Sequence, residues 1–220
     1  MAERNGRRKT REQLSKRRVP ELGYYFIVTD TKETEQNYML GLRDSIPKNL
    51  QGKLVIKVCK AKTVALIDEA LSMASLQPQY GEPWIVFDRD RVKGFDQIIM
   101  LAQEKGINVG WSNPCIEIWF SAYFGVMPTY PDSVSCCNGF EEIYSHATGQ
   151  NYQKSDDAIY TKLCRFGDEA QALDLAKQKL REHIRNCKAT PSEMCPATTL
   201  HVLVEEIQKK IVGGKNARTK

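Results

Sequence analysis

The sequence predicts an α/β fold, in which a parallel sheet is flanked by helices and followed by a helical C-terminal extension. Between residues 24 and 124, apolar runs rich in strand-forming residues alternate four times with stretches of helical spacing. Strands that alternate with helices are typical of a parallel sheet with helices on its faces. The chain has 220 residues, of which 41% are hydrophobic, and this is enough for a substantial core.

The first half of the chain contains four predicted strand–helix pairs. Strands are expected at 24–29, 53–59, 84–87 and 107–111, where aliphatic and aromatic residues cluster or alternate. Helices are expected at 34–46, 63–76, 94–105 and 113–124; Pro47 ends the first and Gly106 the third. The fourth helix is expected to begin at Asn113-Pro114, because proline is preorganised for a first helical turn.

The second half has a weaker pattern. Residues 125–150 are richer in Pro, Gly and Ser and are predicted to be irregular, with a short helix near 140–146. Residues 156–186 predict two helices that meet near Gly167, and 198–211 predicts a last helix. The expected organisation is a basic arm (1–20), an α/β core (21–125), a helical extension packed on that core (126–212) and a basic tail (213–220).

The net charge of +5 is unevenly distributed. Residues 1–20 carry +6 and residues 208–220 carry +5, which leaves −6 on the rest of the chain. Basic ends suit the phosphate backbone of a nucleic acid, where binding releases counterions. The same charge also fits solvated ends that bind nothing.

Several classes of protein are disfavoured. No run of about 18 apolar residues predicts a membrane span, and the N-terminal residues do not form a secretory signal. Seven cysteines without a Cys-x-x-Cys motif argue against a zinc or disulfide framework and favour reduced thiols in the cytoplasm. A phosphate-binding Gly-x-x-x-x-Gly-Lys loop is absent, which disfavours ATP hydrolysis by this chain alone.

Asp88 and Asp90 follow the third predicted strand. Ligands of α/β proteins bind at the carboxyl ends of the strands, and residues at i and i+2 of an extended chain point the same way. Two close carboxylates repel each other, and a divalent cation removes that conflict. The pair therefore predicts a Mg²⁺ or Mn²⁺ site, the alternative being a polar turn in which Asp90 caps the next helix.

Three further carboxylates are expected at the same end of the sheet. Asp30 follows the first strand, Glu35 begins the next helix, and Glu117 lies in an otherwise apolar helix where a carboxylate needs a partner. Such a cluster of hard oxygen ligands suits phosphodiester chemistry with a bound cation. The structural alternatives are a turn residue for Asp30 and a favourable helix-dipole position for Glu35.

Four segments carry a resemblance to a known family. They are residues 26–29 with 34–38, 86–90, 112–119 and 196–199. The most specific is Ser-Asn-Pro-Cys-x-Glu-x-Trp at 112–119, and its distance from Asp-Arg-Asp at 88–90 also fits. Over about residues 20–210, the chain resembles the RloB-like proteins, a Toprim-type group associated with bacterial abortive infection and anti-phage defence.

The resemblance implies a Rossmann-like Toprim core and a divalent-metal-dependent nuclease that acts on RNA, including tRNA, or on DNA. It maps Asp30, Asp88 and Asp90 onto metal ligands. The catalytic candidates are Asp30, which would complete the site or orient water, and Glu35 and Glu117, which the sequence pattern itself places at this end of the sheet. It also implies an ATPase partner protein, and it leaves open whether the chain forms a homo-oligomer. The residues expected to contact nucleic acid are Arg7, Arg8, Lys9, Arg17, Arg18, Arg89, Arg91, Asn113 and Lys154.

Two departures from the family pattern favour an alternative. The family usually has Glu-Gly where this chain has Asp30-Thr31, and it tends to have His where this chain has Tyr123. Asp is shorter by one methylene, and a tyrosine transfers protons poorly near pH 7. The alternative is a non-catalytic sensor or regulatory subunit of an ATPase-associated defence complex; nucleotide or cyclic-oligonucleotide binding at the same sheet end is a third option.

Overall fold

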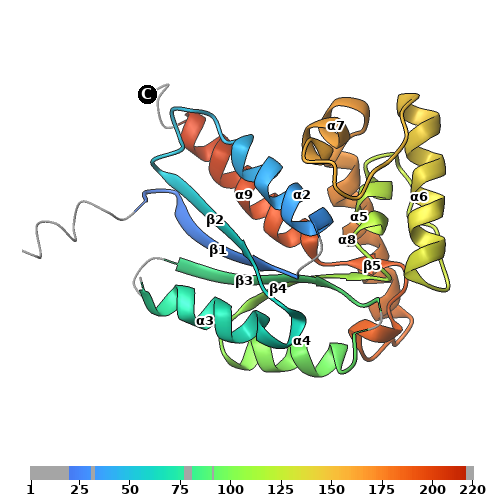
Figure 1. Ribbon diagram of the computed structural model, residues 1–220, viewed down its shortest axis with the longest axis horizontal. Coiled ribbons are helices and arrows are strands. Elements are labelled where there is room, and N and C mark those ends of the chain that lie inside the picture. The colour runs from blue at the N-terminus through green and yellow to red at the C-terminus, as the bar shows by residue number, and fades with distance from the viewer. Residues whose placement is uncertain (1–19, 31–32, 77–80, 91, 217–220) are drawn as a thin grey trace, which may run out of the picture.

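The computed structural model describes residues 20–30, 33–76, 81–90 and 92–216, and its centre is a five-stranded sheet in the order β2-β1-β3-β4-β5 (Figure 1). Four strands are parallel: β1 (Gly23–Thr29), β2 (Leu54–Lys60), β3 (Gly81–Asp88) and β4 (Asn108–Asn113). The short β5 (Ala197–Thr198) runs antiparallel to β4. The α/β class, the four predicted strands and the Rossmann-like core are therefore confirmed.

Helices cover both faces of this sheet. Figure 1 shows α2 (Glu33–Asp44) and α9 (Leu200–Asn216) on one face, and α3 (Leu66–Leu76) and α4 (Phe95–Glu104) on the other. Each face has its own apolar core because alternate strand residues point opposite ways: Ile27 and Val86 face one core, and Val28 and Ile85 the other. A 3₁₀ turn, η1 (Thr63–Ala65), precedes α3.

Four helices gather beyond one end of the sheet. They are α5 (Glu117–Ala122), α6 (Ser133–Thr148), α7 (Ile159–Phe166) and α8 (Glu169–Arg185) (Figure 1). All six residues of α5 are buried, because α6 and α8 both pack against it. A second 3₁₀ turn, η2 (Pro191–Glu193), leads from α8 to β5. The chain after residue 125 thus contributes both a strand and a covering helix to the central sheet.

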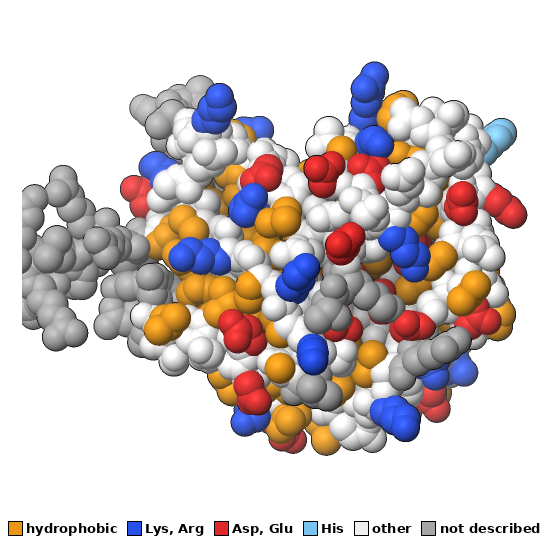
Figure 2. Space-filling model, in the orientation of Figure 1, with side chains coloured by type: hydrophobic (Ala, Val, Ile, Leu, Met, Phe, Trp, Pro, Cys, Tyr) orange, Lys and Arg blue, Asp and Glu red, His pale blue; other side chains and the backbone are white. Residues whose placement is uncertain are grey.

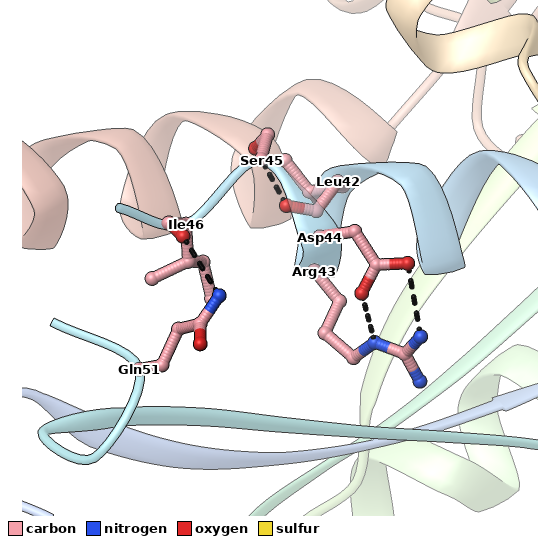
Figure 3. Close-up of polar contacts among 6 residues, drawn as sticks. All are labelled: Leu42, Arg43, Asp44, Ser45, Ile46 and Gln51. Atoms are coloured by element: carbon pink, nitrogen blue, oxygen red, sulfur yellow. Dashed lines mark hydrogen bonds and ion pairs between the residues drawn. The ribbon is translucent and has the colours of Figure 1, made fainter. Parts of the chain in front are cut away.

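The end of α2 is closed by local polar contacts (Figure 3). Ser45 Oγ donates to the Leu42 carbonyl at 2.6 Å, and Gln51 Nε2 donates to the Ile46 carbonyl at 3.3 Å. Arg43 pairs with the neighbouring carboxylate of Asp44 through two hydrogen bonds of 2.7 and 3.0 Å. The helix ends two residues before the predicted Ile46, with its last carbonyls still satisfied.

Two predictions about helices were wrong. The Asn113-Pro114 peptide is cis, β4 continues to Asn113, and the next helix begins only at Glu117. Asn113 is extended because it pairs with Ala197 of β5, a contact from a distant part of the chain. Residues 125–150 are not mainly irregular, since α6 covers 133–148 and its N-terminus is capped by Asp132, which accepts from the Ser135 amide at 2.7 Å.

Gly41 lies where α2 and α7 approach closely. A Cβ at Gly41 would lie 2.5 Å from the Cβ of Tyr160, and neither atom can move without its helix. In an exposed helix, Gly→Ala stabilises by about 1 kcal/mol. Here we expect Gly41→Ala to lower the free energy of unfolding by about 1–3 kcal/mol through overpacking. Urea denaturation measures this loss of stability. Gly52→Ala is the control, because a Cβ at Gly52 would have nothing within 4 Å. Equal denaturation midpoints for the two variants would contradict the prediction.

Within the described ranges, none of the helices combines the length and the apolar character needed to cross a lipid bilayer.

Candidate functional site

A cavity of about 410 Å³ lies at the carboxyl ends of β3 and β4, where α2, α5 and α6 meet. Its wall contains four carboxylates, from Glu35, Asp88, Asp90 and Glu117. Among the described lining residues, Lys154 supplies the single cationic side chain. The cavity therefore concentrates negative charge at the sheet end where α/β proteins bind their ligands.

Asp88 is one of the buried carboxylates of this cavity. It is the last residue of β3, pairs with Ser112 of β4 and is 5% exposed. Burial raises its pKa well above the usual value, and the nearby charges of Glu35 and Glu117 raise it further. Glu35 acts on Asp88 from the same cavity wall, while the Ile116 amide partly offsets these effects. Without a cation, Asp88 therefore retains a proton at higher pH than an exposed aspartate.

Asp90 reaches the same cavity by a different route from the one predicted. The extended conformation does not continue past Asp88, because Asp90 has a φ of 30°. Its amide donates to the Pro114 carbonyl at 3.0 Å, and its Oδ1 accepts a hydrogen bond from Ser133 Oγ at the start of α6. A turn fixed by these contacts, and not strand alternation, brings Asp88 and Asp90 to one cavity.

Glu117 is 1% exposed at the start of α5 and has two partners. Tyr152 Oη donates to Glu117 Oε1 at 3.1 Å, and Lys154 Nζ lies 3.6 Å from the same oxygen. Thr34 Oγ1 donates to the Lys154 carbonyl at 3.1 Å, which ties the start of α2 to this segment. Burial opposes the charge on Lys154, but Glu117 and Cys137 outweigh it and raise the pKa of the amine. We expected from the sequence that the Glu117 carboxylate would need a partner, and the structure provides two, Lys154 and Tyr152.

Asp30 does not line this cavity. It follows β1, and its Oδ2 accepts a hydrogen bond of 2.7 Å from Thr63 Oγ1 in η1, on the side of the sheet toward β2. Glu35 is the residue of the β1–α2 region whose carboxyl group reaches Asp88. The structure therefore brings together four of the five predicted carboxylates and places Asp30 apart from them.

The residues predicted to contact nucleic acid are dispersed. Asn113 is buried, and its amide donates to the carbonyls of Pro191 and Ser192 at 3.1 Å each, so its side chain faces η2 and not a ligand. Arg89 directly follows the last residue of β3, and its backbone amide donates to the Ser112 carbonyl at 2.8 Å. Lys154 lines the cavity with a side chain that is 58% exposed. The remaining predictions lie outside the described residues: Arg7, Arg8, Lys9, Arg17, Arg18 and Arg91.

The face in Figure 2 shows how charge is distributed on the described surface. Lys and Arg side chains are interspersed with Asp and Glu there, so this face presents no continuous basic patch among the described residues. Attraction of a polyanion to this face would depend on basic residues elsewhere in the chain.

Two cysteines line the cavity, although the sequence gave no reason to pair them. Cys115 precedes α5 and Cys137 lies on α6. Their sulfurs and a Glu117 oxygen lie within 4.8 Å of one another. Contact with the Cys115 thiol, and with the amine of Lys154, lowers the pKa of Cys137 despite its partial burial. The one available signal was the position of Cys115 inside the 112–119 motif; its proximity to Cys137 depends on the packing of α5 against α6.

Tyr123, which replaces the histidine of the family pattern, lies outside the cavity. It is 1% exposed, and its hydroxyl contacts the Tyr38 hydroxyl at 2.8 Å and donates to Glu169 Oε2 at 3.0 Å. Tyr160 donates to the same Glu169 oxygen at 3.0 Å. These groups form a buried network that joins α2, α5, α7 and α8, and Tyr123 has a structural place in it.

We expect Tyr123→Phe to lower the free energy of unfolding by about 1–3 kcal/mol, because Tyr38 and Glu169 each lose a buried partner. Chemical denaturation measures the loss, with Tyr24→Phe on β1 as a control outside the network. Titration of the cavity with Mn²⁺ should give the same result for the variant and the wild type. A large drop in metal affinity with unchanged stability would show instead that Tyr123 acts on the site.

Comparison with known proteins gives one match. The family model described as RloB-like protein matches residues 25–207. No curated protein and no solved structure matches the chain. The matched range includes all four carboxylates of the cavity, together with Cys115, Cys137 and Lys154.

Proposed function

Since the chain belongs to the RloB-like family, we propose that it is a divalent-metal-dependent nuclease that cleaves RNA or DNA in anti-phage defence. The observation that carries the proposal is the burial of Glu35, Asp88 and Glu117 together in the wall of one acidic cavity at the sheet end. Carboxylates held this close are electrostatically costly, and a bound cation offsets that cost. The donor set is oxygen-rich, which suits Mg²⁺ or Mn²⁺.

Each residue has a part in this proposal. Asp88, Asp90 and Glu35 would hold the cation. A bound cation would neutralise the scissile phosphate and acidify a coordinated water. Glu117 is placed to accept a proton, with Tyr152 fixing the position of Oε1. Lys154 combines an exposed side chain with a place in the cavity wall, so it is the described cation best placed to contact a phosphate.

The test is a cleavage assay with the purified full chain and tRNA, other RNA and DNA as separate substrates. We expect cleavage of at least one substrate with Mg²⁺ or Mn²⁺, and its loss when the ion is removed with EDTA. Electron paramagnetic resonance of added Mn²⁺ would report binding independently of cleavage. Cleavage that is undiminished in excess chelator would overturn the proposal.

A second candidate is a non-catalytic sensor or regulatory subunit that docks on an ATPase. The position of Asp30 favours it, because one acidic residue of the implied set is held by Thr63 outside the cavity. This candidate predicts Mn²⁺ binding without cleavage by the lone chain, and toxicity in cells only when the ATPase partner is co-expressed. Cleavage by the lone chain would exclude it.

A further inference from the structure

The Cys115–Cys137–Glu117 group differs chemically from the rest of the cavity. Its two sulfurs and one carboxylate oxygen come from the β4–α5 connection, α6 and α5, and they lie within 4.8 Å of one another. All seven cysteines of the described structure are free thiols. Two of them, Cys164 and Cys187, are exposed and lie far along the sequence from Cys115 and Cys137. The cavity therefore has an oxygen-rich side and a sulfur-containing side that share Glu117.

The spacing of these atoms suits a small thiophilic ion. Zinc binds sulfur at about 2.3 Å, so two sulfurs of a tetrahedral site lie about 3.8 Å apart. With separations of at most 4.8 Å, the three ligand atoms are already close to that geometry. A disulfide demands a much closer approach, with sulfurs about 2.05 Å apart. Soft thiolates select zinc over magnesium, whereas the Glu35–Asp88–Asp90 side offers oxygen alone.

Surrounding contacts support the same chemistry. Lys154 Nζ lies 3.6 Å from Glu117 Oε1 and within hydrogen-bonding reach of Cys137, so one cation faces two ligands of the group. Tyr152 donates to Glu117 Oε1 at 3.1 Å. Outer contacts of this kind orient metal ligands and strengthen binding.

We propose that Cys115, Cys137 and Glu117 bind one thiophilic divalent cation, of which Zn²⁺ is the physiological example, with the fourth position open to the cavity. Each thiol releases its proton to solvent as its sulfur binds, so loading frees two protons for each ion. Zinc in this position takes Glu117 away from the oxygen-rich side. The inference does not rest on nuclease activity, because binding is read from the metal–sulfur bond itself.

The test is a titration of the reduced, metal-free full chain with Co²⁺ under anaerobic conditions. We expect ultraviolet thiolate-to-metal charge-transfer absorption and visible bands of tetrahedral Co²⁺, both saturating at one ion per chain and both removed by stoichiometric Zn²⁺. A large excess of Mg²⁺ should leave the bands in place. Absence of the charge-transfer band would overturn the proposal.

Variants locate the site. Cys115→Ser and Cys137→Ser should each weaken Co²⁺ binding by at least about 100-fold, and Glu117→Gln by about 10-fold or more. Cys187→Ser and Cys164→Ser are matched controls and should bind like the wild type. Thermal melting of the metal-free variants separates lost ligands from lost folding, and Cys137 is the safer position because it is only partly buried. An unchanged charge-transfer band in folded Cys137→Ser would overturn the proposal. A band lost only in Cys136→Ser, a change at the buried neighbour of Cys137 on α6, would also overturn it.

Discussion

Asp88→Asn is expected to abolish metal-dependent cleavage and, at the same time, to make the metal-free protein more stable. The first effect follows because Asp88 is a buried carboxylate in the cavity wall, and a neutral amide holds a divalent cation poorly. The bound cation contributes several kcal/mol of charge stabilisation, so its loss should lower the rate by about 1,000-fold or more. The measurement is single-turnover cleavage of the best substrate in saturating Mg²⁺.

The second effect follows from the raised pKa of Asp88. Burial and the charges of Glu35 and Glu117 place the folded-state pKa above the unfolded value of 3.8. The carboxyl group therefore contributes stability below that value, and this stability is lost as the pH rises through the folded-state pKa. An asparagine does not titrate, so the variant should be more stable than the metal-free wild type by about 1–3 kcal/mol near neutral pH.

The curves of stability against pH for the two proteins should converge as the pH falls below 3.8, where Asp88 is protonated in both the folded and the unfolded wild type. Denaturant midpoints across this range, in EDTA, measure the difference. Asp174→Asn is the matched control, since it makes the same change at an exposed position of α8. A gain in stability that is independent of pH would contradict the electrostatic explanation.

Trp119→Ala is expected to have the largest effect on stability. The indole is fully buried in α5, with its ring centroid 5.3 Å from that of Tyr123 in an edge-on contact. Removal of a buried Trp leaves a large cavity and costs about 3–5 kcal/mol, a major part of the stability of a typical domain. Guanidinium denaturation measures the loss, and Trp119→Phe should recover more than half of it.

The same substitution should also weaken metal binding, because Glu117 lies two residues earlier on the same short helix. Mn²⁺ affinity, measured at a temperature where Trp119→Ala is still folded, tests this coupling. A loss of stability below about 1 kcal/mol would mean that α6 and α8 close over the vacated space.

The fold was largely predictable, because its first half depends on local patterns. Strands β1 to β4 are apolar runs, and the helices between them have clear apolar stripes. Only residues 140–146 of α6 were expected to be helical, and its first part was missed because Ser, Cys, Asn and Gly are weak helix formers. Its buried stripe of Cys136, Phe140 and Tyr144 has a four-residue spacing that was available as a signal. The start of α5 was misplaced because pairing of Asn113 with Ala197 overrides the local preference of proline.

The site was predictable in part, for a geometrical reason. Parallel strands deliver Asp88 and the residues after β4 to one end of the sheet, so a cluster there follows from topology. Asp30 obeys the same rule, yet its side chain turns toward Thr63, and the end of a strand does not fix such a rotation. Cys137 could not have been found, because its place beside Cys115 is set by how a distant helix packs.

The position of α9 has a consequence for biosynthesis. Leu200, Leu203, Val204, Ile207 and Ile211 complete the larger core against a sheet whose parallel strands end by residue 113. At about 5–20 residues per second, a ribosome needs several seconds to make the chain between them. During that interval one face of the nascent sheet has α2 but lacks the rest of its cover, which is when chaperone binding and aggregation compete. The residues that line the acidic cavity, by contrast, are all made before α9, so the site is translated ahead of the helix that completes the larger core.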